Sequence, residues 1–234
     1  MLAEIWVEDA VQKLRPDFAV LAMTAEGLAN DASDDVSADW LHKAGLRAAE
    51  AAQARSAQGS ADDPHVLAWR EAYRGFGAKP QRTRPSVDAL LRRVDQLPAI
   101  NRVVDAYNAV SVEYALPIGG EDLDTYQGTA RLVRARGDEG FETTAGGAPA
   151  IEHPDAGEVV WRDDQGVTCR RWNWRQCVRT RITETTENAL FLLERLEPYP
   201  LERLHAAADD LAARLRTIAP EVRIRTRLIG DGTW

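Results

Sequence analysis

The segment VTCRRWNWRQCVRTR, Val167–Arg181, gathers positive charge and tryptophan in one short stretch without any acidic residue. The chain as a whole is acidic, with 29 Lys+Arg against 37 Asp+Glu and a formal net charge of -8. A guanidinium group makes paired, directional hydrogen bonds to anionic oxygens, and an indole ring offers a flat face to a base. The segment therefore indicates either a ligand-facing strand or an arginine-rich strand that water solvates, flanked by core tryptophans. Its candidate functional side chains are Arg170, Arg171, Trp172, Asn173, Trp174, Arg175, Arg179 and Arg181.

This segment also sets the fold of the second half of the chain, because it is predicted to form one arm of a β-hairpin. Glu158–Trp161 is the first arm, Asp163–Gly166 is the turn, and Val167–Trp172 begins the second arm. Side chains alternate between the two faces of a strand. We therefore expect one face to carry Arg170, Trp172 and Trp174, and the other to carry Cys169, Arg171 and Asn173.

Length and composition are those of an ordinary globular protein of 234 residues, of which 44% are hydrophobic and 28% charged. This is enough chain for one sizeable core. No apolar run approaches the ~20 residues of a membrane span, and the first residues, MLAEIWVEDA, lack the features of a signal peptide. We therefore expect a cytoplasmic protein without a membrane partner. The acidic balance also argues against binding to duplex DNA, because such binding depends on neutralising many phosphates.

The sequence lacks the signatures of the common hydrolase and cofactor sites. Cys169 and Cys177 are too few for a disulfide framework or a zinc cluster, so we expect reduced thiols. The chain contains no GxSxG motif, no HExxH motif and no Walker phosphate-binding loop, and its four histidines are isolated. We therefore expect neither a metal nor another cofactor. The three acids of Gly119–Asp124 (GGEDLD) are expected in a solvated loop.

Apolar spacing and turn residues predict the secondary structure of both halves of the chain. The expected strands are Glu4–Val7, Phe18–Met23, Arg131–Arg136, the two hairpin arms and Ile224–Leu228. The expected helices are Ala38–Arg55, Pro64–Tyr73, Ser86–Val94, Ile100–Val110, the apolar run ENALFLLE (Glu187–Glu194) and Leu201–Leu215. Tyr73–Pro85 is a basic loop and Pro117–Gly120 a turn. Together these elements predict one compact α+β domain.

The stretch NRVVDAYNAVSVEYALPIGGEDLDTYQG, Asn101–Gly128, resembles the B3/B4 module of the β subunit of bacterial phenylalanyl-tRNA synthetase. In that module an NxVVDxxN helix precedes a glycine turn and an acid-leucine-acid segment. The matching residues of this chain are Asn101, Val103, Val104, Asp105, Asn108, Gly119, Asp122 and Leu123. The order continues through RLVRARGDEGFET, CRRWNWRQ and TETTENALFLLE, and the tryptophan-arginine segment is similar to that of free-standing B3/4 proteins.

The resemblance covers about Arg70–Leu215 and implies a single three-layer β/β/α domain. On this expectation residues 70–234 form the B3/4 domain, and residues 1–69 add strands and helices to the same core. The family implies hydrolysis of mischarged aminoacyl-tRNA in trans, so aminoacyl-tRNA is the expected partner. The histidine of the synthetase editing pocket aligns with Gly119. The glutamate that reads the substrate side chain aligns near Leu192–Glu194, so the resemblance leaves the amino acid open.

The expected site residues follow from the chemistry of the ester together with this resemblance. An aminoacyl ester is already activated, so its hydrolysis needs a held ester, a placed water and a stabilised oxyanion rather than a nucleophilic side chain. We expect Asn173 and Arg175 to act on the ester. Trp172 or Trp174 is expected to stack on the terminal base, and Asp122 to pair with the α-ammonium group. The further binding residues expected are Asn108, Gly119, Arg170, Thr180 (with Thr183 and Thr186) and Glu194.

Two other functions fit the same residues. The chain is alternatively a tRNA-binding protein without hydrolytic activity, which a glycine in place of the synthetase histidine would permit. It is alternatively a small-molecule protein that binds a free amino acid through Trp172, Trp174 and Asp122. The oligomeric state stays open on the sequence alone.

Overall fold

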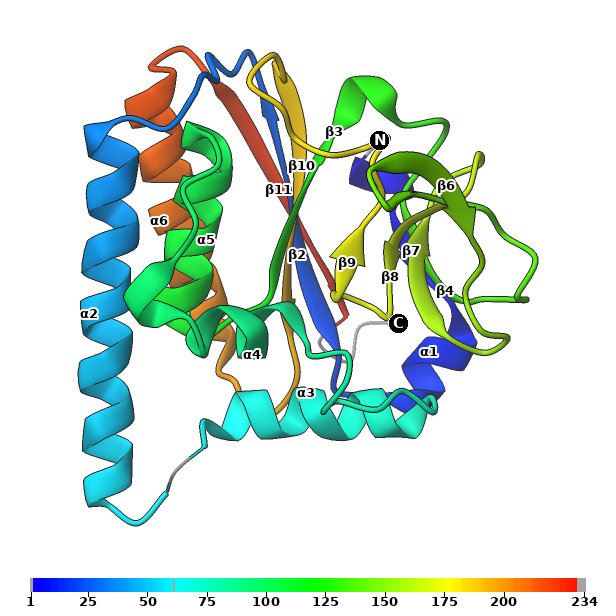
Figure 1. Cartoon of the computed structure of the whole chain (residues 1–234), viewed down its shortest axis with the longest axis horizontal. Helices are drawn as coiled ribbons and strands as arrows, with labels where there is room; N and C mark the ends of the chain where they lie inside the picture. Colours follow the sequence, from blue (N-terminus) through cyan, green and yellow to red (C-terminus); the bar gives the residue numbers. More distant parts are fainter. Residues whose placement is uncertain (1, 61, 231–234) are drawn as a thin grey trace.

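The computed structural model describes residues 2–60 and 62–230, in which two large sheets and a layer of helices are stacked (Figure 1). The fold is therefore α+β with the expected three layers. The middle sheet consists, in order, of β11 (Arg223–Gly230), β2 (Ala19–Glu26), β10 (Asn188–Arg195) and β3 (Ile118–Asp122). The outer sheet consists of β1 (Trp6–Val7), β4 (Arg131–Arg134), β7 (Val159–Arg162), β8 (Val167–Arg170) and β9 (Arg175–Gln176). A separate hairpin pairs β5 (Phe141–Ala145) with β6 (Ala148–Glu152).

The helices complete the domain. The α-helices are α1 (Asp9–Leu14), α2 (Asp35–Ala57), α3 (Pro64–Gly75), α4 (Ser86–Leu91), α5 (Arg102–Tyr114) and α6 (Leu201–Ile218). Short 3-10 turns cover Leu2–Glu4, Val94–Gln96 and Leu123–Thr125. The predicted helices at Ala38–Arg55, Pro64–Tyr73, Ile100–Val110 and Leu201–Leu215 are therefore confirmed as α2, α3, α5 and α6, whereas the one predicted to end at Val94 ends at Leu91. None of the helices in the described ranges is long and apolar enough to cross a membrane.

Strand β2 is buried on both faces because the middle sheet lies between two layers. Leu21 and Met23 pack with the helices, whereas Val20 and Ala22 on the opposite face pack with the outer sheet. This alternation follows from the two-residue period of a strand. Its sequence, AVLAMTAE, is accordingly an apolar run rather than an alternation of apolar and polar residues.

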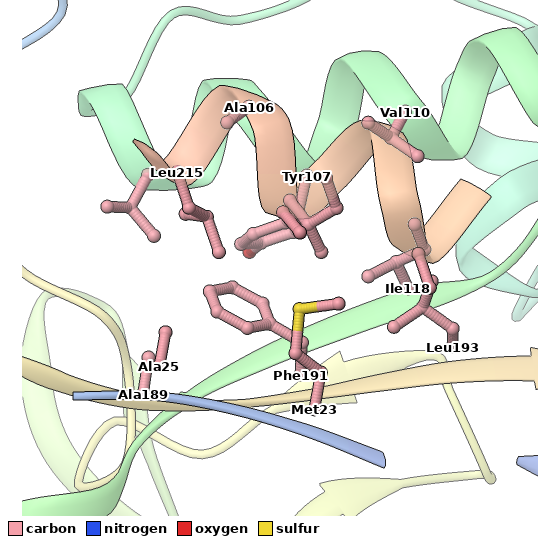
Figure 2. Close-up of a cluster of buried hydrophobic side chains, with 14 of the residues drawn as sticks. Met23, Ala25, Ala106, Tyr107, Val110, Ile118, Ala189, Phe191, Leu193 and Leu215 are labelled. Atoms are coloured by element: carbon pink, nitrogen blue, oxygen red, sulfur yellow. The ribbon is translucent and has the colours of Figure 1, made fainter. Parts of the chain in front are cut away.

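The helical layer covers the middle sheet through one large apolar cluster. Figure 2 shows Met23 and Phe191 of the sheet pointing toward Tyr107 of α5 and Leu215 of α6. The α5 helix is held at its start by Asn101, whose side chain accepts a hydrogen bond from the Val104 amide at 2.9 Å. That cap fixes where α5 begins.

Two sequence-based predictions in this part of the fold are wrong. Glu187–Glu194 is not helical, because Asn188–Arg195 forms β10 and pairs with both β2 and β3. A short apolar run without a helical period is equally typical of a strand that is buried on both faces, and tertiary packing decides between the two. Pro117–Gly120 is not a turn, since Gly119 and Gly120 lie in β3 opposite Leu192 and Phe191.

The predicted hairpin of β7 and β8 is confirmed, but its second arm is shorter than expected. Trp161 pairs with Cys169, and the strand ends at Arg170. Arg171 and Trp172 then adopt positive φ angles of 50° and 67°, which turn the chain sharply toward β9. The alternation of faces expected for residues 169–174 is therefore wrong, because these residues do not continue one strand.

Gly120 and Gly119 provide a matched test of the packing between β3 and α5. A Cβ at Gly120 would lie 2.7 Å from Tyr107 Cε1 and 2.9 Å from Ile182 Cδ1, both in the core, whereas a Cβ at Gly119 would lie 3.7 Å from Gln176 Nε2. We expect Gly120→Ala to lower the free energy of unfolding by about 1–3 kcal/mol and Gly119→Ala to change it by less than about 0.5 kcal/mol. Urea unfolding of both variants measures this difference, and equal losses would contradict the packing described here.

Candidate functional site

A cavity of about 240 Å³ lies where the two large sheets meet α4 and α5. Its walls come from α4, the middle of α5, the strands β3, β7 and β10, and the segment that runs from β8 to β9. Leu90, Ile118 and Leu192 give it apolar surface. A concave, partly apolar site with a few polar groups is the usual form of a small-ligand site.

Seven of the ten predicted site residues line this cavity, and three do not. The lining residues are Asn108, Gly119, Trp172, Asn173, Trp174, Arg175 and Glu194. Asp122, Arg170 and Thr180 are not among the residues that line it. We call residues 171–174, between β8 and β9, the tryptophan-arginine turn. This turn and the α5 helix, which carries Asn108, are therefore two walls of one cavity.

Asp122, which is predicted to contact an α-ammonium group, forms hydrogen bonds within the chain. Its Oδ1 accepts a hydrogen bond from the Asp124 amide at 2.9 Å, and its Oδ2 accepts one from the Thr186 hydroxyl at 2.6 Å. Both carboxylate oxygens thus hold the turn that follows β3. Thr180 donates a hydrogen bond to Glu121 Oε2 at 2.6 Å and supports a cavity residue from behind.

The arginines of the tryptophan-arginine segment are mostly bound to acids of the same chain. Arg170 is buried, and its Nε and Nη2 each donate to a Glu158 oxygen at 3.0 Å. Arg175 pairs with Glu152. Arg171 forms ion pairs with Asp155 and Glu158. Arg179 forms ion pairs with Asp163 and Glu142. The predicted basic surface is therefore largely neutralised, which the sequence segment alone could not reveal because the acidic partners lie elsewhere in the chain.

The two tryptophans of the turn differ in their availability to a ligand. Trp172 is fully buried and packs edge-on against Phe18 and Trp69, with ring centroids 5.1 and 5.3 Å away, so it cannot stack on a base. Trp174 is half-buried, and the guanidinium groups of Arg171 and Arg175 both lie 4.7 Å from its ring centre. A base that stacked on Trp174 would compete with them.

Asn173 is fixed by hydrogen bonds on both sides of its amide group. Its Oδ1 accepts a hydrogen bond from the Tyr73 hydroxyl at 2.8 Å, and its Nδ2 donates to Glu194 Oε2 at 2.8 Å. The other oxygen, Glu194 Oε1, accepts a hydrogen bond from Trp161 Nε1 at 2.7 Å. A primary amide carries two N–H groups. One N–H of Asn173 therefore remains for a ligand in the cavity.

Two glutamates give the cavity an unusual acid content. Glu194 and Glu121 both line it, and both are almost completely buried. Burial raises the pKa of Glu194 to about 8, against the effect of the hydrogen bonds from Asn173 and Trp161. Burial likewise raises the pKa of Glu121 to about 7, although the Thr180 and Tyr126 hydroxyls donate to its Oε2.

Several further residues line this cavity that the sequence did not predict, among them Glu121, Trp161 and Tyr107. Glu121 was assigned to a solvated loop, but the strand β3 carries it inside. Trp161 is expected only as a hairpin residue, yet it lines the cavity. Tyr107 is expected in the core; it is buried there, and it also lines the cavity. Each of them points inward because of a strand or helix pairing with a distant segment. The sequence signal available was the acidic GGEDLD run next to the matched asparagine helix.

Within the described ranges, no group of three or more His, Cys, Asp or Glu side chains is arranged to hold a metal ion. Cys169 and Cys177 are both buried free thiols. Burial raises the pKa of Cys169 well above its usual value, so this cavity residue is not an activated nucleophile. The polar groups of the lining are carboxyl, amide, guanidinium and hydroxyl groups, and the Ser86 hydroxyl is buried without a hydrogen-bond partner among the described residues.

Comparison with known proteins gives the family. A family model described as the B3/4 domain matches residues 68–218. No curated protein matches the chain. Among solved structures, an N-terminal fragment of the phenylalanyl-tRNA synthetase β-subunit from Pyrococcus horikoshii is similar at 14% identity and a TM-score of 0.46. The match covers 94% of this chain and 50% of that fragment, so this chain spans about half the fragment's length. Because the family model accounts for well over half of the sequence, the chain belongs to the B3/4 domain family.

Proposed function

We propose that this protein hydrolyses the ester bond of mischarged aminoacyl-tRNA in trans, with the amino acid held in the cavity between the two sheets. The observation that carries the proposal is a pair of buried glutamates on the cavity wall that have no cationic partner in the described part of the chain. Membership of the B3/4 family agrees with a tRNA-related role.

Glu121 and Glu194 have hydrogen-bond donors that are all neutral: hydroxyl groups for Glu121, and an amide and an indole for Glu194. Neither forms an ion pair with a described residue. A buried carboxylate is unfavourable without a counter-charge, so both acids keep their protons to a higher pH than an exposed glutamate does. An aminoacyl ester carries an α-ammonium group. Binding that group beside either glutamate would supply the missing positive charge and release a proton from the carboxyl group.

Asn173 is the best-placed group for the ester itself. Its amide group is held between Tyr73 and Glu194 by two hydrogen bonds. These bonds fix the orientation of the remaining N–H group of the amide. A fixed donor stabilises a developing oxyanion more than a mobile one does, because it needs no reorganisation. A water molecule then attacks the ester carbonyl carbon, and the bond between that carbon and the ribose oxygen breaks. The leaving ribose oxygen takes up the proton that the water loses, with the neighbouring ribose hydroxyl as the relay, so no covalent enzyme intermediate forms.

Arg175 and Trp174 are suited to the terminal adenosine. Both side chains are half-buried, in contrast to the buried glutamates, so they lie on the solvent side of the cavity lining. The Arg175 Nε is buried without a partner among the described residues. It is a donor that a ribose or phosphate oxygen could satisfy. In this arrangement the amino acid points inward and the nucleotide outward.

The first test is release of amino acid from a panel of misacylated tRNAs. We expect the wild type to deacylate at least one of them and Asn173→Ala to lower the rate about 10²–10³-fold, as loss of an oxyanion donor does elsewhere. Tyr73→Phe is the matched control, because it removes one hydrogen bond to Asn173 but keeps the amide, so we expect about tenfold loss or less. Arg175→Ala should mainly raise KM.

The panel also separates the alternatives. If the wild type releases no amino acid from any tRNA, the hydrolase proposal is wrong. Thermal stabilisation by free amino acids but not by tRNA would then favour an amino-acid-binding protein, since the same two glutamates suit a free α-ammonium group. Stabilisation by uncharged tRNA without ester loss would favour a non-catalytic tRNA-binding protein.

The second test concerns the charge state of Glu121. Glu121→Gln keeps an oxygen that accepts from Thr180 and Tyr126 but removes the titration. The unfolded chain loses the Glu121 proton near the ordinary pKa of 4.5, whereas the folded protein keeps it to about pH 7. The stability of the wild type therefore falls relative to the variant as pH rises between these values, by at most about 3 kcal/mol. Denaturant unfolding across this range measures the difference; parallel pH curves would show that Glu121 is not a buried neutral acid.

A further inference from the structure

The loop between α3 and α4 carries positive charge that the fold does not neutralise. Its cations are Lys79, Arg82 and Arg84, and Arg74 precedes it in the last turn of α3. Arg74, Lys79 and Arg82 are exposed, and none of the four forms an ion pair with any residue in the described ranges. Four of the five arginines of the tryptophan-arginine segment are, by contrast, paired with acids. In a chain with a net charge of -8, this loop is therefore a local site for an anion.

The loop is held in one conformation. The amides of Arg82 and Thr83 donate to the Lys79 carbonyl at 2.9 and 3.0 Å, which closes a tight turn. Pro80 and Thr83 of the loop are themselves buried. The cationic side chains are consequently presented on an ordered backbone, so less conformational entropy is lost when they bind a ligand.

The loop also lies beside the substrate cavity. At its end the Ser86 amide donates to the Asn173 carbonyl at 3.2 Å, and both residues line the cavity. At its start Phe76 packs near Trp172, with ring centroids 6.3 Å apart. The loop is thus joined to the tryptophan-arginine turn at both ends.

A second hollow, of about 440 Å³, lies on the other side of that turn. Lys79, Arg82 and Thr83 of the loop line this hollow, and Arg171, Asp155 and Glu158 line it as well. Arg171 lines this hollow, and the next residues, Trp172–Gln176, line the substrate cavity. The tryptophan-arginine turn therefore separates the two spaces. Asp155 pairs with Arg171 at 3.7 Å, which leaves Lys79 and Arg82 as the unpaired charges.

We propose that Lys79 and Arg82 bind backbone phosphates of the RNA close to its aminoacylated 3′ end while the amino acid occupies the cavity. This inference rests on the proposed function, because it is the aminoacyl end in the cavity that places RNA phosphates beside the loop. The loop, rather than the tryptophan-arginine segment, then supplies the sequence-independent part of the RNA affinity.

The test compares Lys79→Ala/Arg82→Ala with Arg203→Ala/Arg216→Ala in binding to uncharged tRNA over a range of salt concentrations. The control removes two exposed cations from α6, which lies in the helical layer on the far side of the middle sheet (Figure 1). Both double variants therefore carry the same net charge. We expect the loop variant to lose about tenfold or more in affinity at low salt and to reduce the slope of log affinity against log salt by about 1.5, as loss of two phosphate contacts predicts. The control should retain the wild-type slope.

Single variants Lys79→Ala and Arg82→Ala should each remove about half of that slope change, so the result does not depend on one double variant folding well. Equal behaviour of the loop and control variants, or no tRNA binding by the wild type, would overturn the inference. Hydrolysis of an aminoacyl-adenosine ester, which lacks the RNA, is measured in parallel and should be unchanged in the loop variant. Failure of the wild type to release amino acid from every misacylated tRNA of the panel would instead refute the proposed function, while the binding experiment would still decide whether the loop binds RNA.

Discussion

The hydrogen bonds of the Glu194 carboxyl group connect the parts of the molecule that form the cavity. Glu194 belongs to the middle sheet, Trp161 to the outer sheet and Asn173 to the tryptophan-arginine turn. Asn173 also accepts a hydrogen bond from Tyr73 of α3. The same burial that makes these bonds strong raises the pKa of Glu194 to about 8. Neutral donors satisfy its oxygens without neutralising a charge. A cavity built around such an acid is suited to a ligand that brings a positive charge with it.

Much of the fold could be predicted from local patterns. Amphipathic spacing identified α5 and α6, and the resemblance to the B3/B4 module identified the family and the three-layer arrangement. The errors occurred where long-range pairing decides the structure. The apolar run of β10 has no period that separates a helix from a doubly buried strand, and Gly119-Gly120 fits a turn as well as a strand beneath Tyr107. The positive φ angles of Arg171 and Trp172 have no sequence signature, because neither residue is glycine.

The site was predicted in part, for a similar reason. Asn108 and Asn173 were identified by motif and lie on the cavity wall. Residue type alone could not tell which arginines are free. Arg170 is bound to Glu158, which immediately precedes β7, whereas Lys79 and Arg82, in a loop expected to be solvated, are unpaired within the described residues. The positive charge of the tryptophan-arginine segment is thus largely neutralised by acids of the folded chain. The unpaired positive charge lies in the adjacent loop between α3 and α4.

The most direct test of the account is a crystal structure with a hydrolysis-resistant analogue, an amino acid joined by an amide bond to 3′-amino-3′-deoxyadenosine. The account predicts that the amino acid occupies the cavity with its ammonium nitrogen about 2.7–3.2 Å from a carboxyl oxygen of Glu194 or Glu121, and with the adenosine beside Arg175. An analogue bound outside the cavity, or an ammonium group facing solvent away from both glutamates, would contradict it.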